Sequence, residues 1–142
     1  MPQIPPRPTA DKAMVLSVAK IIAAKLDGAD AETIAQHYSR HMDGFDLCIK
    51  LSKYAGWVVT RDDMDILDEL DYLVDQAERD AVREWVGKFD PQPMLPIGTR
   101  IKEGVITGLS DGYYPACYLV KVDGETNDNS RRIIKFEAAV PT

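Results

Sequence analysis

With 142 residues, the chain is long enough for one compact domain, or for a helical core with a small appendage, and too short for two large independent domains. Its composition, 45% hydrophobic and 28% charged, is typical of globular proteins, so we expect disorder only at the ends. The formal net charge is −6, and its distribution along the chain is uneven.

The N-terminus predicts an extended arm followed by a helix. The opening MPQIPPRP has four prolines, which fix φ and remove backbone donors. A helix is expected from about Ala10 to Leu26, with Thr9 as its cap and a stop at Asp27-Gly28. Its core stripe at helical spacing is Val15, Val18, Ile22 and Leu26. The apolar run 13–24 is interrupted by Lys20 and is too short to span a bilayer, so we interpret it as a buried helix.

Two shorter helices are expected next. Asp30 can cap a helix that continues to about Met42, with Ile34, Tyr38 and either His41 or Met42 on one stripe. Asp43-Gly44 separates it from a third helix that Gly56 ends. The core face of that helix is either Phe45, Cys48, Leu51 and Ala55, or Leu47, Leu51 and Tyr54.

The longest helix is predicted at about Arg61 to Val86, because Thr60 and Asp63 are spaced as in a capping box. Its core stripe alternates in steps of three and four: Leu67, Leu70, Val74, Ala77, Ala81 and Trp85. Three prolines in residues 90–97 then predict a linker, since they suit neither a helix nor a central strand.

Beyond the linker the periodicity changes to that of strands. We expect strands at about Thr99–Thr107, Tyr114–Val122 and Arg132–Glu137, separated by Gly- and Asp-rich turns at 108–112 and 123–129. The sequences GVITG, YYPACYLVKVDG and RIIKFEAA resemble the curved strands of small SH3-like barrels, over about 40 residues. The resemblance implies a small antiparallel sheet and identifies no functional residue.

These elements predict an α+β fold with about four helices, the fourth of them long, followed by an SH3-like or three-stranded antiparallel sheet. The predicted divisions are an extended arm at 1–8, a helical domain at 9–89, a linker at 90–97 and a β-subdomain at 98–142 that packs on the helices. Cys48 and Cys117 lie in apolar stretches without metal-type spacing, so we expect both to be reduced, in a cytoplasmic protein with no membrane association.

The strongest functional signal is a cluster of acidic residues in the long helix. Residues 62–84 carry ten Asp and Glu side chains against two arginines, a balance of −8, whereas the rest of the chain sums to +2. On a helical wheel, one face carries acidic residues around an exposed tyrosine. The predicted partner-binding residues are Asp62, Asp65, Asp68, Glu69, Tyr72 and Asp75, with Tyr113 and Tyr114 at a hairpin tip as a second element.

Two interpretations of the acidic face stay open. Carboxylates early in a helix interact favourably with its dipole, so such a face is common without any partner. Alternatively, it mimics the charge of a nucleic acid and occupies a basic protein surface. Small inhibitors made by phages and mobile elements, among them DNA mimics and some anti-CRISPR proteins, are similar to this chain in size and acidity.

Other chemistries are less well supported. His37 and His41 have i,i+4 spacing, but they share a face with apolar residues and lack the glutamate of HExxH, so we expect no metal and no cofactor. A helix-turn-helix is an alternative, although the recognition helix offers only Lys50 and Lys53, so we expect no direct contact with nucleic acid. No GxSxG, P-loop or GxGxxG motif occurs, which leaves an enzyme of unrecognised type as a further alternative.

The sequence therefore predicts a non-enzymatic interaction protein that inhibits a nucleic-acid-handling protein by occluding its basic surface. The stripe of the long helix also has the spacing of a coiled-coil seam, which would allow a homodimer.

Overall fold

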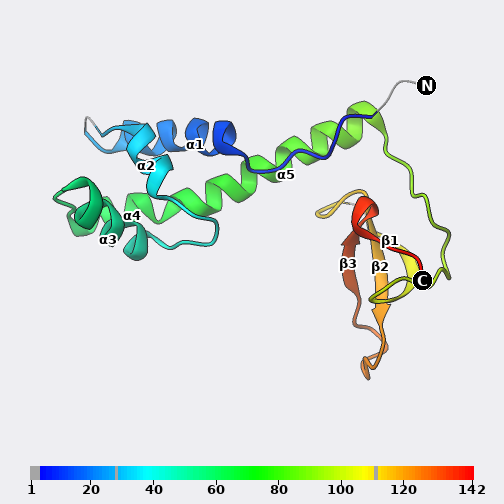
Figure 1. Ribbon diagram of the computed structural model, residues 1–142. Coiled ribbons are helices and arrows are strands. Elements are labelled where there is room, and N and C mark those ends of the chain that lie inside the picture. The colour runs from blue at the N-terminus through cyan, green and yellow to red at the C-terminus, as the bar shows by residue number, and fades with distance from the viewer. Residues whose placement is uncertain (1–3, 28, 111) are drawn as a thin grey trace. The chain divides into compact units, whose positions relative to one another are not determined.

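The computed structural model describes residues 4–27, 29–110 and 112–142, and its architecture is α+β, as predicted (Figure 1). The helices are α1 (Lys12–Lys25), α2 (Ala31–His37), α3 (Gly44–Ala55), α4 (Arg61–Leu67) and α5 (Glu69–Phe89). The strands are β1 (Gly104–Ser110), β2 (Cys117–Val122) and β3 (Arg132–Lys135), followed by a 3-10 turn at Phe136–Ala138. The predicted helix stop at Gly28 and the turn residue Asp111 lie outside the described residues.

The chain forms two compact units. A helical unit consists of residues 8–81, and a C-terminal unit consists of residues 82–142 together with the described arm residues 4–7. The predicted divisions followed the change from helix to strand, whereas the two units meet in sequence within α5. The first part of α5 thus belongs to the helical unit, and its last turns belong to the C-terminal unit.

The helical unit has one hydrophobic core, to which all its helices contribute. Its fully buried side chains include Ile22, Ile34, Leu47, Leu51, Leu67, Leu70 and Val74. Each of the first four helices begins with a side-chain cap, from Asp11, Asp30, Asp43 and Thr60 in turn. Such caps satisfy backbone N–H groups that have no partner inside the helix. Thr60 and Asp63 form the predicted capping box, with both reciprocal bonds present.

Two helix boundaries differ from the prediction. Helix α1 is capped by Asp11, whose carboxylate accepts the N–H of Met14 at 2.9 Å, and not by Thr9. Helix α2 ends at His37 instead of Met42, and His41 has a left-handed φ of 68°. Periodicity predicted a continuous helix to about Met42, but the His41 N–H donates to the Asp71 carboxylate instead of to a helical carbonyl, and residues 38–43 are not helical.

The predicted core faces of α3 are only partly buried in the structure. Leu47 and Leu51 are buried, whereas Phe45 is 60% exposed and Tyr54 is 64% exposed. Only one side of this helix meets the core, so neither predicted stripe is buried over its whole length.

The long helix appears as two elements joined at Asp68. The backbone there stays right-handed, with φ −64° and ψ −22°, and the Asp68 N–H still donates to the Met64 carbonyl at 2.9 Å. The apolar stripe is buried as predicted at Leu67, Leu70 and Val74, and again at Trp85.

The C-terminal unit contains an antiparallel meander in the order β1-β2-β3. Its core side chains are Ile101, Ile106, Tyr118, Val120 and Ile134. A second cluster brings Val82 and Trp85 of α5 against Ala116. The register between β1 and β2 shifts between Ile106 and Gly108, which marks an irregularity of the bulge type.

The strands begin or end at residues other than those predicted. Residues 98–101 fold back along β1 instead of starting it, because the Gly98 N–H donates to Ile106 at 2.7 Å and the Ile106 N–H donates to Thr99 at 3.0 Å. Ala116 has a left-handed φ of 57°, so β2 begins only at Cys117. Strand β3 ends at Lys135, where the 3-10 turn takes over.

Candidate acidic interface

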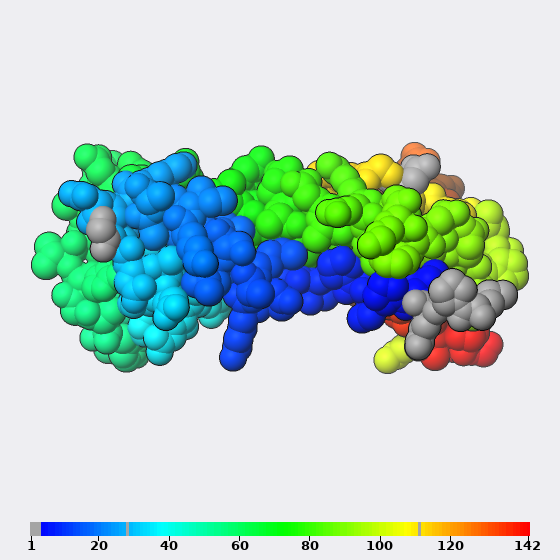
Figure 2. Space-filling model, turned by 90° about the horizontal axis from the view of Figure 1, so that it is seen from above, coloured from blue at the N-terminus to red at the C-terminus, as the bar shows by residue number. Residues whose placement is uncertain are grey.

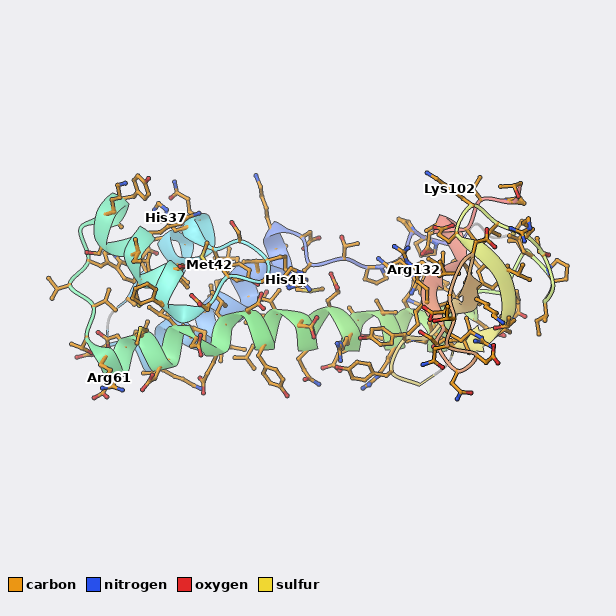
Figure 3. All side chains as sticks on the ribbon, turned by 90° about the horizontal axis from the view of Figure 1, so that it is seen from below. His37, His41, Met42, Arg61, Lys102 and Arg132 are labelled. Carbon is orange, nitrogen blue, oxygen red and sulfur yellow. The ribbon has the colours of Figure 1, made fainter. Side chains whose placement is uncertain are left out.

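Several carboxylates of the long helix hold the segment between α2 and α3. One oxygen of Asp71 accepts the hydroxyl of Tyr38 and also the N–H of His41, the latter at 2.7 Å. One oxygen of Asp68 accepts the N–H of Gly44 at 2.7 Å. Figure 3 labels His41 and Met42 on this segment, which runs beside the long helix. Asp71 therefore replaces the backbone partner that a longer α2 would have given His41, and Asp68 satisfies the first N–H of α3.

Arg40 extends this network along α5. Its guanidinium contacts Asp75 at 3.3 Å and Glu78 at 3.2 Å, and Arg79 contacts Asp75 at 3.1 Å. Glu78 also accepts the N–H of Ala10 at 2.7 Å, which ties the start of the helical unit to α5. Asp75 and Glu78 are thus neutralised from within the fold, and their charge is less available to a partner than the sequence implies.

Tyr38 is the titratable group most strongly affected by this arrangement. Burial of its ring and the hydrogen bond to the Asp71 carboxylate both raise the pKa of the Tyr38 hydroxyl well above its usual range. Because the phenol donates to a carboxylate, ionising it would remove the bond and place two negative charges together. The Tyr38–Asp71 pair is therefore a structural contact that depends on a neutral phenol.

A second group of acidic residues faces solvent. Asp62, Asp65, Glu69 and Tyr72 are spaced by three, four and three residues, which places them on one face of α4 and the start of α5. All four are exposed, Tyr72 to 67%. Glu69 makes a surface ion pair with Lys25 at 3.0 Å. We call Asp62, Asp65, Glu69 and Tyr72 the acidic face.

The predicted partner-binding residues of the long helix thus divide into two sets. Asp62, Asp65, Glu69 and Tyr72 form the acidic face, whereas Asp68 and Asp75 bind groups of the same unit. The helical unit as a whole carries fifteen Asp and Glu residues against eight Lys and Arg residues, a formal charge of −7. The acidic face therefore belongs to a unit whose overall charge has the same sign.

The predicted aromatic element lies in the other unit. The rings of Tyr113 and Tyr114 pack edge to face at 4.8 Å, and both are about half exposed. An edge-to-face pair of this kind is favourable in itself. The two tyrosines belong to the C-terminal unit, whereas the acidic face belongs to the helical unit.

An exposed apolar groove in the helical unit was not predicted. Its volume is about 460 Å³, and its lining includes the apolar side chains of Phe45, Ile49 and Met64 together with Lys53 and Arg61. Figure 3 labels Arg61 in the first turn of α4. The i,i+4 pair of Phe45 and Ile49 was the available signal, but an apolar pair in a short helix predicts a core position as readily as an exposed one.

The His37/His41 pair and the helix-turn-helix were the two alternatives that the sequence offered for this region. His37 lies in α2 and its ring stacks on Tyr54 at 6.1 Å, whereas His41 lies beyond the end of that helix. Within the described part of the chain, no three His, Cys, Asp or Glu side chains form a group that could hold a metal ion. Residues 38–43 connect α2 to α3, a longer connection than the three- or four-residue turn of a helix-turn-helix.

Both cysteines are free thiols. Burial is the main cause that raises the pKa of Cys117 and also that of Cys48, where the carboxylates of Asp63 and Asp68 add to it. A raised thiol pKa is the opposite of what a catalytic nucleophile requires.

Among the helices of residues 4–27, 29–110 and 112–142, none has the combined length and apolarity needed to cross a bilayer. Comparison of the chain with protein-family models, with curated proteins and with solved structures found no match.

Proposed function

We propose that the chain is a non-enzymatic binding protein that occupies the basic surface of a nucleic-acid-handling protein and inhibits it by steric and electrostatic occlusion. In this proposal the acidic face makes the contact, and the fold of the helical unit presents it. The proposed contact uses fewer residues than the sequence predicted, because Asp68 and Asp75 bind Gly44 and Arg40 of the same unit.

The observation that carries the proposal is the exposure of the acidic face. Asp62 and Asp65 have no ion-pair partner among the described residues, and Tyr72 adds a 67% exposed aromatic ring beside them. Tyrosine is enriched at protein interfaces because its ring is apolar and its hydroxyl can still form a hydrogen bond. An acidic face with an aromatic ring suits a surface of arginine and lysine side chains.

The spacing of the charges supports a comparison with a nucleic acid. At about 1.5 Å per residue, Asp62, Asp65 and Glu69 follow one another at about 4.5 and 6 Å along the helix axis. Phosphates of one DNA strand recur every 3.4 Å or so along the duplex axis. The charge density along the face is therefore somewhat lower than that of one DNA strand but of the same order, as a competitor for a phosphate-binding surface would need.

The test is a paired charge reversal. Asp62→Lys with Asp65→Lys alters the acidic face, and the control, Glu84→Lys with Glu125→Lys, makes the same change in net charge at two other exposed positions. Asp68 is left unchanged because it binds Gly44. Each protein is immobilised, incubated with cytosol of the source organism at low salt, and washed with 0.5 M salt, at which the Debye length is about 4 Å.

The proposal expects a basic nucleic-acid-binding protein in the wash from the wild-type and control columns and not from the Asp62/Asp65 variant. Purified, that protein should lose nucleic-acid binding when the wild-type chain is added. Equal capture by both variants would remove the acidic face from the mechanism, provided that circular dichroism shows the same helix content in both.

A further inference from the structure

Arg7, in the N-terminal arm, binds in a pocket of the C-terminal unit. Its Nε donates to Oε1 of Glu137 at 2.8 Å, and its two terminal nitrogens donate to the carbonyls of Pro115 at 3.1 Å and Ala116 at 2.6 Å. Its guanidinium carbon lies 5.2 Å from the centre of the Trp85 ring. The side chain is only 8% exposed, which is unusual for an arginine.

The pocket is formed by three separate stretches of the chain. Trp85 comes from the last turns of α5, Glu137 from the 3-10 turn, and the two carbonyls from the segment before β2. Ala116 has a left-handed backbone, with φ 57°. Its carbonyl accepts hydrogen bonds from Arg7 and from the N–H of Phe136, the latter at 3.2 Å. Carboxylate, carbonyls and an aromatic face together match the donors and the planar surface of a guanidinium.

Trp85 also binds the backbone of the arm. Its indole N–H donates to the carbonyl of Pro5 at 2.9 Å, two residues before Arg7. Residues 4–7 lie in neither helix nor strand, and Figure 2 shows the blue arm against the yellow-green end of α5. Proline-rich peptides bind aromatic-lined grooves in this manner, because their φ angles are fixed in advance and their carbonyls stay free to accept hydrogen bonds. The arm is therefore held as a peptide ligand would be held.

We propose that the pocket of Trp85, Pro115, Ala116 and Glu137 is a binding site for Pro-Pro-Arg segments, that the chain's own arm fills it, and that a Pro-Pro-Arg segment of a partner protein displaces the arm. The chain's own arm would thus block the site until a partner segment replaces it. The arm and the pocket belong to the same chain, so a free segment with the same contacts competes with an intramolecular ligand and binds poorly unless it is abundant or has a second attachment point.

The contacts are of a kind that can exchange. Glu137 is half exposed, so its ion pair with Arg7 is screened by solvent. The other contacts are hydrogen bonds to backbone carbonyls and one ring face, all of which a second arginine can form equally well. The site is independent of the acidic face and uses none of its residues.

The test uses the full chain with Arg7→Ala, which vacates the pocket. Trp57→Phe is added so that Trp85 is the one remaining tryptophan and its fluorescence reports on the pocket. The probe is the peptide acetyl-Ile-Pro-Pro-Arg-Pro-amide, and the control peptide has lysine in place of arginine, which keeps the charge and removes the planar fork.

The vacated chain should bind the arginine peptide at least about tenfold more tightly than the chain that keeps Arg7, and about tenfold more tightly than it binds the lysine peptide. Adding Glu137→Gln to the vacated chain should weaken binding. The proposal is overturned if a folded Arg7→Ala chain binds neither peptide, or binds both equally.

A measurement on the unaltered sequence covers the case in which Arg7→Ala does not fold. A dye at the N-terminus of the wild-type chain should lose fluorescence anisotropy when the arginine peptide is added at millimolar concentration, because the arm is released. The lysine peptide should leave the anisotropy unchanged. An anisotropy that responds to neither peptide would show that the arm is a fixed part of the fold.

Discussion

The backbone N–H of Gly44 donates to Oδ1 of Asp68 at 2.7 Å, and the first residue of α3 thereby lies directly against the joint between α4 and α5. A Cβ at residue 44 would lie 2.6 Å from the Met64 carbonyl oxygen and 2.7 Å from the Asp68 Cβ. Met64 belongs to α4 and Asp68 joins α4 to α5, so neither can move without disturbing these helices.

Gly44→Ala should therefore lower the free energy of unfolding by about 1–3 kcal/mol, the usual cost of overpacking. Urea unfolding followed by circular dichroism measures it. The control is Gly87→Ala in α5, where an added Cβ would meet nothing within 4 Å. There the greater helix propensity of alanine should raise the unfolding free energy, by up to about 1 kcal/mol. If both variants change stability in the same direction, the close contact at Gly44 does not limit the fold.

Carboxylates that bind groups of the helical unit, such as Asp71, should affect stability more than those of the acidic face. Asp71→Ala leaves the Tyr38 hydroxyl and the His41 N–H without their acceptor, and we expect a loss of about 1–3 kcal/mol. Asp65→Ala removes an exposed carboxylate and should change the unfolding free energy by no more than about 0.5 kcal/mol. Thermal unfolding of the two variants side by side distinguishes them, and equal losses would contradict the different roles of Asp71 and Asp65.

The Tyr38–Asp71 contact should weaken folding at alkaline pH. The pKa of Tyr38 is raised in the folded chain above the usual tyrosine value of 10.0, so its contribution is fully present below pH 10. Above that pH the unfolded chain loses the proton while folded Tyr38 keeps it, and stability falls by up to about 1.4 kcal/mol per pH unit.

Tyr38→Phe removes this dependence. The wild-type chain should exceed the variant in stability by about 1 kcal/mol at neutral pH, and the difference should shrink as the pH rises from 10 to 11. Denaturant unfolding at a series of pH values provides the measurement. A difference that stays constant over this range would mean that the phenol titrates normally in the folded state.

The two thiols should react at different rates. Cys117 is 3% exposed and Cys48 is partly exposed, and burial raises the pKa of each, so alkylation at pH 8 should be slow and biphasic. The faster phase belongs to Cys48, and a Cys48→Ser chain should keep only the slower phase. Iodoacetamide labelling followed by mass spectrometry identifies each site. Faster labelling at Cys117 would contradict its burial.

Local signals in the sequence sufficed for the helices and their order. The capping box of Thr60 and Asp63 and the stripe through Leu67, Leu70 and Val74 depend on residues within a few positions of one another, and both are confirmed. The end of α2 was predicted wrongly because it depends on Asp71, thirty positions beyond His41. Periodicity reports only on near neighbours, so it could not detect a competing acceptor on another helix.

The same reason limited the prediction of the candidate site. A helical wheel separates the apolar side of the long helix from its polar side, and it placed Asp62, Asp65 and Glu69 on the outer face, where the structure has them exposed. It could not show that Asp68 and Asp75, at the margins, meet Gly44 and Arg40. The pocket of Arg7 was inaccessible to such reasoning, since its partners are more than 70 positions away in the sequence.

The two edges of the sheet affect how readily the protein would aggregate at high concentration. An exposed strand edge can pair with another molecule and start aggregation. The outer edge of β1 is covered by residues 98–101, which fold back along it. Strand β3 is only four residues long, carries exposed Arg132 and Lys135, and ends in a 3-10 turn. Short, charged edges resist intermolecular pairing, so both edges of this three-stranded sheet are protected against pairing with another molecule.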